Sequence, residues 1–267
     1  MVYLGTNLTK RIESPYPDGC RSAVSLSFDD GRRCQLDIAL PILNDRELLS
    51  TFYVPPKDSA AGSDWATALS EWKEVVRQGH EVGNHTLSHI CSRGFRNSLE
   101  ERCLETMTLQ EIETDILEAE RRLNEVLGPA QRTFAYPCYQ DYVGDGLTRQ
   151  SYVPIIAKYF IAARCRGEQA NYPLTCSMTY LWSYPVEGMS GSAMIELIER
   201  AKSLGQWCIL TLHGIDTGGL MVYKKDFLEV CDFLARDRGD IWIAPVIDVA
   251  RRIIDWRASL TPTIQEI

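Results

Sequence analysis

Histidines and one pair of adjacent aspartates are the residues in this chain that are best suited to metal-assisted chemistry. Asp29 and Asp30 stand at the end of an apolar run, and His85 and His89 are four residues apart. On a helical turn, two imidazoles at this spacing lie on nearly the same face, so both can reach one cation at about 2.0–2.1 Å. With one of the two adjacent carboxylates as the anionic third ligand, one coordination position would stay open for water. The spacing therefore predicts a site for a divalent cation.

The neighbouring polar residues suggest acid–base chemistry beside that cation. Asp29 and Asp30 point in different directions at the end of a strand, so one of them could bind the cation while the other faces the bound water as a general base. His213 directly follows the apolar run 207–212. The fourth histidine, His80, is interpreted as a buried hydrogen-bonding residue, and the Cys138 thiol as a small packed side chain. Each residue alone is also compatible with a structural role, so the hypothesis rests on their combination.

The composition limits the kind of protein and its partners. The 267 residues are 45% hydrophobic and 24% charged, which is typical of a globular chain with a sizeable core. The net charge is −8 and no basic run occurs, so nucleic acid and an anionic membrane are disfavoured as partners. No stretch approaches the roughly 18 apolar residues of a membrane span. A homo-oligomer is compatible with the sequence.

The cysteines indicate a compartment. There are nine of them, scattered along the chain and without a Cys-x-x-Cys pair. In a chain of this length, we expect free thiols in a reducing environment rather than a disulfide framework. The sequence shows no signal peptide, and this predicts a cytoplasmic protein, with secretion left open if the chain has been trimmed.

Short apolar runs alternate with helical patterns along the chain. The clearest helix is Thr108–Leu127, because Thr108 and Glu111 form a capping box and Gly128 provides a stop. We expect strands at 23–28, 50–54, 80–83, 133–136, 160–163, 207–212 and 241–244, and helices at 34–48, 65–78, 108–127, 152–158, 193–204, 224–235 and 246–257. This order predicts an α/β fold whose mostly parallel sheet is closed, or nearly closed, into a barrel. The candidate residues follow strands, where such folds place their chemistry.

Four segments resemble the ordered motifs of a known family. SLSFDDG (25–31), HEVGNHTLSH (80–89), FAYP (134–137) and LTLH (210–213) are similar to those of the polysaccharide deacetylases with a NodB-homology domain, carbohydrate esterase family 4, in a FAYP sub-type. The resemblance spans about residues 21–257, with 1–20 as an N-terminal extension and 258–267 as a C-terminal tail. It implies a single-domain deformed (β/α)7-type barrel.

The resemblance also implies a cofactor and residue roles. The cofactor would be a divalent metal, usually Zn²⁺, with Co²⁺, Ni²⁺ or Mn²⁺ as alternatives. By the resemblance, Asp29 would be the general base and His213 the general acid, and the metal ligands would be Asp30, His85 and His89.

The third and fourth motifs depart from the family pattern. Many members carry an Arg in the third motif that orients the base, whereas this chain reads AYPCY at 135–139. The backbone N–H of Cys138 could still stabilise an oxyanion, and we hypothesise that Arg164 supplies the missing charge. The Asp of the fourth motif, which tunes the acid histidine, has no clear match; Asp216 and Asp248 are the candidates.

Aromatic residues and loops near these motifs are candidates for substrate binding. Tyr136, Pro137 and Tyr139 belong to the third motif, and Trp182 in the sequence Trp-Ser-Tyr could stack on a sugar or simply pack. We expect the loops 91–107, 138–151 and 164–191 to shape a substrate groove.

These observations predict a metal-dependent hydrolase that removes N-acetyl groups from an oligo- or polysaccharide containing amino sugars. The alternatives are an O-acetyl esterase acting on a xylan-type substrate, an amidase for small molecules on the same scaffold, and a carbohydrate-binding protein without activity. Two histidines and a carboxylate also occur in non-haem iron oxygenases, but those sites are typically built on all-β scaffolds, unlike this β/α alternation.

Overall fold

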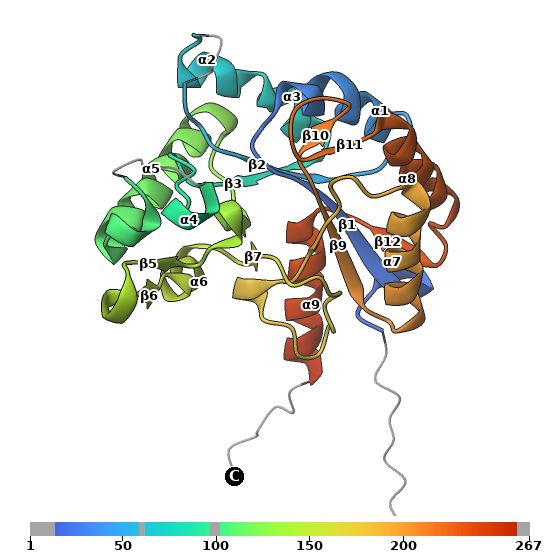
Figure 1. Cartoon of the computed structure of the whole chain (residues 1–267). Helices are drawn as coiled ribbons and strands as arrows, with labels where there is room; N and C mark the ends of the chain where they lie inside the picture. Colours follow the sequence, from blue (N-terminus) through green and yellow to red (C-terminus); the bar gives the residue numbers. More distant parts are fainter. Residues whose placement is uncertain (1–13, 59–61, 97–101, 261–267) are drawn as a thin grey trace, which may run out of the picture.

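A curled parallel sheet forms the centre of the molecule (Figure 1). The computed structural model describes residues 14–58, 62–96 and 102–260. Within this part of the chain, one sheet has the strand order β7-β4-β3-β2-β1-β9-β8, and β12 pairs with the first half of β1. Its members are β1 (Ser22–Phe28), β2 (Thr51–Val54), β3 (Glu81–Asn84), β4 (Phe134–Ala135), β7 (Ala163–Arg164), β8 (Tyr184–Pro185), β9 (Trp207–Leu212) and β12 (Ile241–Ile243).

The two ends of this sheet approach each other. Arg164 in β7 forms a parallel bridge with Leu181, shortly before β8, through two backbone hydrogen bonds of 2.7 and 2.8 Å. The sheet is therefore a deformed, nearly closed barrel, as the sequence predicted. Closure brings the carboxyl ends of its strands to one rim.

The central strand β1 shows how the barrel is filled. Val24, Leu26 and Phe28 point outward into the largest apolar cluster, together with residues of the surrounding helices. Ser25 and Ser27 lie on the opposite face, where they donate hydrogen bonds to the carbonyls of Ala244 and Leu210. The barrel interior is thus lined by small polar side chains along this strand, and the next inward position after Ser27 is Asp29.

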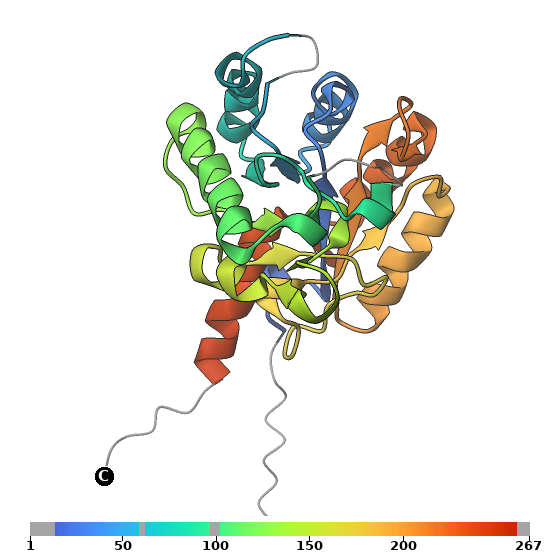
Figure 2. The same cartoon turned by 60° about the vertical axis from the view of Figure 1, so that its left-hand side comes forward.

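Helices surround the outside of the sheet (Figure 2). They are α1 (Leu40–Asn44), α2 (Trp65–Ser70), α3 (Trp72–Arg77), α5 (Leu109–Leu127), α7 (Gly191–Ser203) and α8 (Lys224–Arg236), with α4 (Arg93–Arg96) and α6 (Val153–Tyr159) near the third-motif loop. The capping box of Thr108 and Glu111 on α5 is confirmed. The helix predicted at 65–78 is interrupted at Glu71, and the one at 34–48 is shorter and begins as a π-helical turn, Gln35–Ala39.

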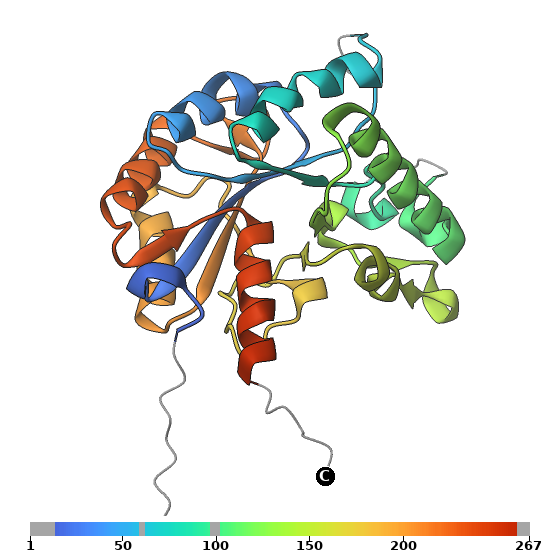
Figure 3. The same cartoon turned by 180° about the vertical axis from the view of Figure 1, so that it is seen from behind.

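The last helix, α9 (Val246–Leu260), covers the amino end of the barrel, and Figure 3 shows it from behind. Its residues Val246, Val249 and Ile253 pack on Trp207 and Ile209 of β9. The sequence analysis missed β8 and four further two-residue strands in loops, because such short strands carry no periodic signal. Of these four, β5 (Tyr142–Val143) and β6 (Gln150–Ser151) pair antiparallel, and β10 (Gly214–Ile215) pairs with β11 (Met221–Val222).

The structure corrects the expectation that all cysteines are free thiols. Cys91 and Cys138 form a disulfide, while the other seven cysteines are free. The two residues are 47 apart in sequence, so only the barrel topology brings their loops together. His80, in contrast, is buried and hydrogen-bonded to Ser50 and Asn44, as predicted. None of the helices in the described ranges combines the length and the apolar character needed to cross a bilayer.

Candidate metal centre and active site

The adjacent aspartates lie on a sharp turn directly after β1. The Asp29 N–H still donates to the Leu212 carbonyl at 2.9 Å, which keeps Asp29 in line with the inward face of the strand. Asp30 then adopts a left-handed backbone with φ 76°, and Gly31 follows with φ 60°. A Cβ atom on Gly31 would lie 2.9 Å from Val54, so the turn requires glycine. Consequently the two carboxylates diverge.

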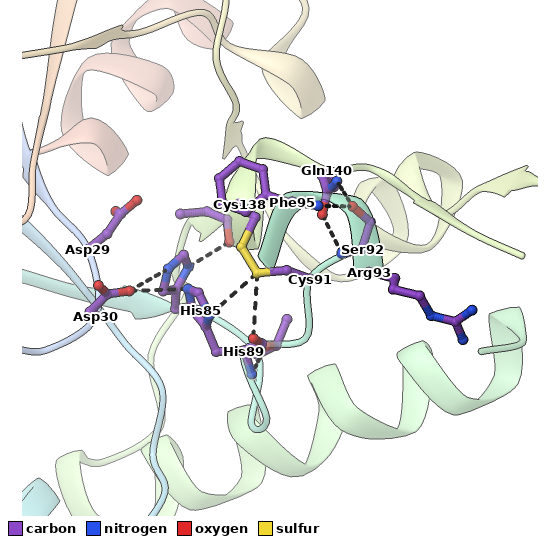
Figure 4. The surroundings of a disulfide bond; sticks show 12 residues. Asp29, Asp30, His85, His89, Cys91, Ser92, Arg93, Phe95, Cys138 and Gln140 are labelled. Atoms are coloured by element: carbon purple, nitrogen blue, oxygen red, sulfur yellow. Dashed lines mark hydrogen bonds and ion pairs between the residues drawn. A yellow bond between two sulfur atoms is a disulfide. The ribbon is translucent and has the colours of Figure 1, made fainter. Parts of the chain in front are cut away.

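Asp30, His85 and His89 converge at the rim (Figure 4). Asp30 Oδ1 lies 3.7 Å from His85 Nε2 and 3.1 Å from His89 Nε2. The expected helical turn is wrong, however. The segment after Asn84 is an irregular loop in which Thr86 and His89 have φ values of 58° and 51°. The imidazoles meet because this loop folds back, with their ring centres 4.7 Å apart.

The donor set fits a divalent cation. His85 Nδ1 faces the Ala135 carbonyl at 2.9 Å, so it carries the proton, and the Nε2 lone pair points toward Asp30. That buried Nε2 atom has no hydrogen-bond partner, which is what a ligand position leaves when only protein atoms are considered. Burial lowers the pKa of His89, despite the opposing effect of Asp30, so this imidazole is neutral near pH 7. One carboxylate and two imidazoles are the donor types of an open site for a divalent cation.

Arg32 is a residue of this site that sequence reasoning missed. Its guanidinium donates to Asp30 Oδ2 through Nε at 3.1 Å and Nη2 at 2.8 Å, and a third N–H reaches the Gly219 carbonyl. Oδ2 is therefore occupied, and Oδ1 remains to face the histidines. In the sequence, only the position of Arg32 two residues after Asp30 could have suggested this role.

Asp29 is buried between two cationic groups. Arg164, which is fully buried, forms an ion pair with Asp29 Oδ1, and His213 Nε2 lies 3.8 Å from Oδ2. Burial would raise the pKa of Asp29, but Arg164, with His85 and His213, outweighs this effect and holds it below its ordinary value of 3.8. Asp29 is therefore a carboxylate at neutral pH. Arg164, which the sequence suggested as a substitute for the third-motif Arg, thus lies directly beside Asp29.

His213 has a carboxylate partner that the sequence analysis did not find. Glu187 Oε1 lies 2.7 Å from His213 Nδ1. Burial would lower the pKa of His213, but Glu187, Asp29 and Asp30 outweigh it and raise the pKa above its ordinary value of 6.5. The candidates Asp216 and Asp248 lie elsewhere: Asp216 accepts the Lys224 N–H at the start of α8, and Asp248 pairs with Arg251 on α9.

The local backbone supports this arrangement of carboxylate and histidine. The buried side-chain amide of Gln35, at the start of the π-helical turn, donates to the carbonyls of both Asp29 and His213. This amide therefore fixes the ends of β1 and β9 relative to each other. Short π-helical turns are frequent at functional sites, and here the turn begins at the residue that contacts both strand ends.

The third-motif loop places its residues in different surroundings. Cys138 and Tyr139 have left-handed backbones, with φ values of 53° and 57°. The amides of Tyr139 and Gln140 donate within the turn to Tyr136 and Pro137, which leaves the Cys138 amide as the candidate oxyanion donor. The Tyr139 ring lies 5.8 Å from the Arg164 guanidinium, and its buried hydroxyl has no partner.

The other predicted substrate contacts are less closely associated with this site. Tyr136 is fully buried and its hydroxyl donates to the Thr179 carbonyl, and Pro137 is buried as well. Trp182 is 41% exposed; its side chain packs on Gly167, and its backbone carbonyl accepts a hydrogen bond from the Asn171 amide. A cavity of about 610 Å³ instead adjoins Asp30, lined on its apolar side by Val54, Pro55, Pro56, Trp65 and Trp72.

Comparisons with known proteins agree with this fold. Residues 17–147 match the family model of polysaccharide deacetylases. A putative polysaccharide deacetylase from Mycobacterium smegmatis has a similar fold, with a TM-score of 0.60 and 16% identity over 94% of this chain and 96% of that one.

Two further similar structures differ in what is recorded of their activity. The family 4 acetyl xylan esterase from Clostridium thermocellum, solved with a cobalt ion, gives a TM-score of 0.52 and 16% identity over 85% of this chain and 90% of that one. A family 4 pseudoenzyme from Bacillus anthracis gives 0.52 and 14%, covering 86% of this chain and 65% of that one. At such identities the likeness supports the fold, and activity has to be argued from the site.

Proposed function

Because this chain belongs to the polysaccharide deacetylase family, we propose that it is a metal-dependent hydrolase that removes N-acetyl groups from an amino-sugar-containing oligo- or polysaccharide. One observation carries the proposal. Asp29 is a buried carboxylate held between Arg164 and His213, directly beside the cluster of Asp30, His85 and His89. A protein that only binds carbohydrate needs neither a buried base nor a paired acid at this position.

Asp29 is the proposed general base. A divalent cation bound by Asp30, His85 and His89, which we expect to be Zn²⁺ before Co²⁺, Ni²⁺ or Mn²⁺, would polarise the acetyl carbonyl and lower the pKa of a water molecule to about 7. Asp29 accepts the proton of the attacking water through the oxygen that Arg164 leaves open. Arg164 keeps this carboxylate ionised and fixes its orientation.

His213 is the proposed general acid. Glu187 on Nδ1 stabilises the imidazolium, so that the proton on Nε2 is available for the departing sugar amine. The imidazolium gives up this proton to the amine nitrogen as the C–N bond breaks. The Cys138 amide is the proposed donor to the oxyanion that forms in between.

The proposal is tested by acetate release. The protein is incubated with N-acetylglucosamine oligomers and, separately, with acetylated xylan, after loading with Zn²⁺ or Co²⁺, and released acetate is quantified. We expect release from the amino-sugar oligomers. Release from xylan alone would show an O-acetyl esterase, like the acetyl xylan esterase among the similar structures. Release from neither substrate would support a small-molecule amidase or an inactive binding protein.

The matched variants separate chemistry from folding. Asp29→Asn should retain one equivalent of metal and lose turnover by about 10²- to 10⁴-fold, since only the base is removed. His85→Ala should lose both metal and turnover. Asp248→Asn, which alters a half-exposed carboxylate on α9, should retain both. Normal metal content in His85→Ala would refute the ligand assignment.

A further inference from the structure

The Cys91–Cys138 disulfide joins the two loops that carry the proposed metal ligand and the proposed oxyanion donor (Figure 4). Cys91 stands two residues after His89, and its sulfur lies 3.9 Å from His89 Nδ1. On the other side of the same ring, Nε2 faces Asp30 at 3.1 Å. The His89 imidazole is therefore held between the carboxylate and the disulfide.

Both loops have backbone conformations that need external support. Thr86, His89, Cys138 and Tyr139 are non-glycine residues with φ between 51° and 58°. Such conformations are unfavourable for side chains with a Cβ atom, and they persist only where the surroundings impose them. A covalent bond between the two loops is a constraint of this kind.

A second, non-covalent junction lies next to the disulfide. Gln140 accepts the Ser92 N–H at 2.7 Å and donates to the Ser92 hydroxyl at 2.6 Å. The Tyr152 hydroxyl holds the Gln140 carbonyl at 2.6 Å. The loops would therefore stay associated without the disulfide, so its loss should change local geometry rather than unfold the protein.

We propose that the Cys91–Cys138 disulfide positions His89 for metal binding, so that the affinity of the site for a divalent cation depends on the oxidation state of this pair. This inference rests on the proposed metal centre. When the S–S bond breaks, the two sulfurs can no longer remain at bonding distance and must separate. Because Cys91 is linked to His89 through one residue, this movement reaches the imidazole, while metal–ligand distances tolerate only about 0.2 Å.

The redox step is an ordinary thiol–disulfide exchange with a dithiol. The dithiol loses two electrons and two protons and becomes a disulfide, the S–S bond breaks, and one proton goes to each of the two cysteine sulfurs. Cys138 is partly exposed, whereas Cys91 is buried, so the reductant would attack Cys138 first. The predicted cytoplasmic location would favour the reduced pair, and an oxidising compartment the bridged one.

The test measures cation binding in both redox states. The apoprotein is either kept oxidised or reduced with a phosphine, which takes oxygen from water as the disulfide becomes two thiols, and the reductant is then removed anaerobically. Thiol titration after denaturation should find seven thiols in the oxidised protein and nine in the reduced one. Titration with Co²⁺, followed by its visible absorption, should give a Kd that is about 10- to 100-fold weaker after reduction, the range seen when groups supporting a ligand are removed.

Three variants control this result. Cys91→Ser/Cys138→Ser should match the reduced wild type and should not respond to the phosphine. Cys20→Ser, a buried thiol at the amino end of β1, should behave as wild type in both states. Gln140→Ala should weaken binding little while the disulfide is intact and considerably more after reduction, because the two junctions support the same loops.

The outcomes are distinct. An unchanged Kd in a protein with nine titratable thiols would overturn the inference, and so would sulfur-to-cobalt charge-transfer absorption in the reduced wild type alone, because the thiolates would then be ligands themselves. Acetate release is measured on the same samples. A redox-dependent Kd without any acetate release refutes the proposed deacetylase and leaves this inference standing. Acetate release with a redox-independent Kd refutes this inference and leaves the proposed deacetylase standing. An oxidised protein that binds no Co²⁺ refutes both.

Discussion

Asp29 and Glu81 are two buried carboxylates at opposite ends of the barrel, and their partners differ in kind. Asp29 follows the carboxyl end of β1 and is paired with the cations Arg164 and His213. Glu81 begins β3 at the amino end, and its four hydrogen bonds of 2.7–3.1 Å come from neutral donors on Thr51, Thr133 and Ile247. Burial raises the pKa of Glu81, because these donors compensate only in part, whereas that of Asp29 is lowered.

The difference in partners indicates a structural role for the Glu81 carboxyl group and a chemical role for that of Asp29. All contacts of Glu81 tie β2, β3 and the residue before β4 to the start of α9. Most of the buried side-chain atoms without a hydrogen-bond partner among the described residues lie around Asp29 instead, among them Arg164 Nε and Nη1, His85 Nε2 and Tyr139 Oη, whereas Ser22 Oγ and Ser50 Oγ are at the amino end. Unsatisfied buried atoms are costly, so their accumulation marks the rim as the place where a ligand is expected.

Removing the Arg164 guanidinium beside Asp29 should have the largest effect on activity among the variants that test this contrast. In Arg164→Ala, kcat/KM for acetate release should fall by about 10²- to 10³-fold, because the base loses its orientation and part of its ionisation. The pKa of Asp29 should rise, so that the acidic limb of the pH profile moves to higher pH. The measurement is kcat/KM as a function of pH.

A conservative variant distinguishes a loss of catalysis from a loss of folding. Breaking a buried ion pair costs roughly 3–5 kcal/mol of stability, so Arg164→Ala must first be shown to be folded by thermal unfolding. Arg164→Lys retains the charge without the planar fork and should recover part of the rate and most of the pH profile. Full turnover in Arg164→Ala would show that this guanidinium has no part in the reaction.

The sequence predicted those parts of the molecule that depend on local patterns. β9 agrees with its predicted range, and α5 begins at its predicted cap, because a continuous apolar run and a capping box are short-range signals. The convergence of Asp30, His85 and His89 followed from strand ends meeting at one rim.

Long-range contacts and irregular backbone could not be predicted in the same way. Glu187 lies in a loop without periodicity, and nothing in its neighbourhood in sequence points to His213. The pairing of Cys91 with Cys138 requires two loops to be adjacent, and scattered cysteines do not encode this. The helical turn assigned to His85 and His89 was wrong because their spacing fits a folded-back loop equally well.

A smaller effect on activity is expected at Glu187, the carboxylate partner of His213. In Glu187→Gln, the pKa of His213 should fall, because a neutral amide no longer stabilises the imidazolium. The acid is then deprotonated at lower pH, so the alkaline limb of the kcat/KM profile should move to lower pH. Activity near neutral pH should drop by about 10-fold. Asp216→Asn is the control, since that carboxylate caps the start of α8, and it should leave the alkaline limb in place.

The smallest effect on activity, and the sharpest contrast with Asp29, is expected for Glu81→Gln. The variant should keep wild-type kcat/KM, but its free energy of unfolding should fall by about 1–3 kcal/mol at low pH, because the amide nitrogen cannot accept the hydrogen bonds that the second carboxyl oxygen accepts. The folded-state pKa of Glu81 is raised, so its stabilising contribution is complete below the ordinary value of 4.5 and is lost as pH rises through the folded-state pKa. The stability difference between wild type and variant should therefore narrow as pH rises, as denaturant unfolding at several pH values would show. A difference that widened with pH would mean that Glu81 is stabilised as a carboxylate, like Asp29, and the distinction between the two ends of the barrel would not hold.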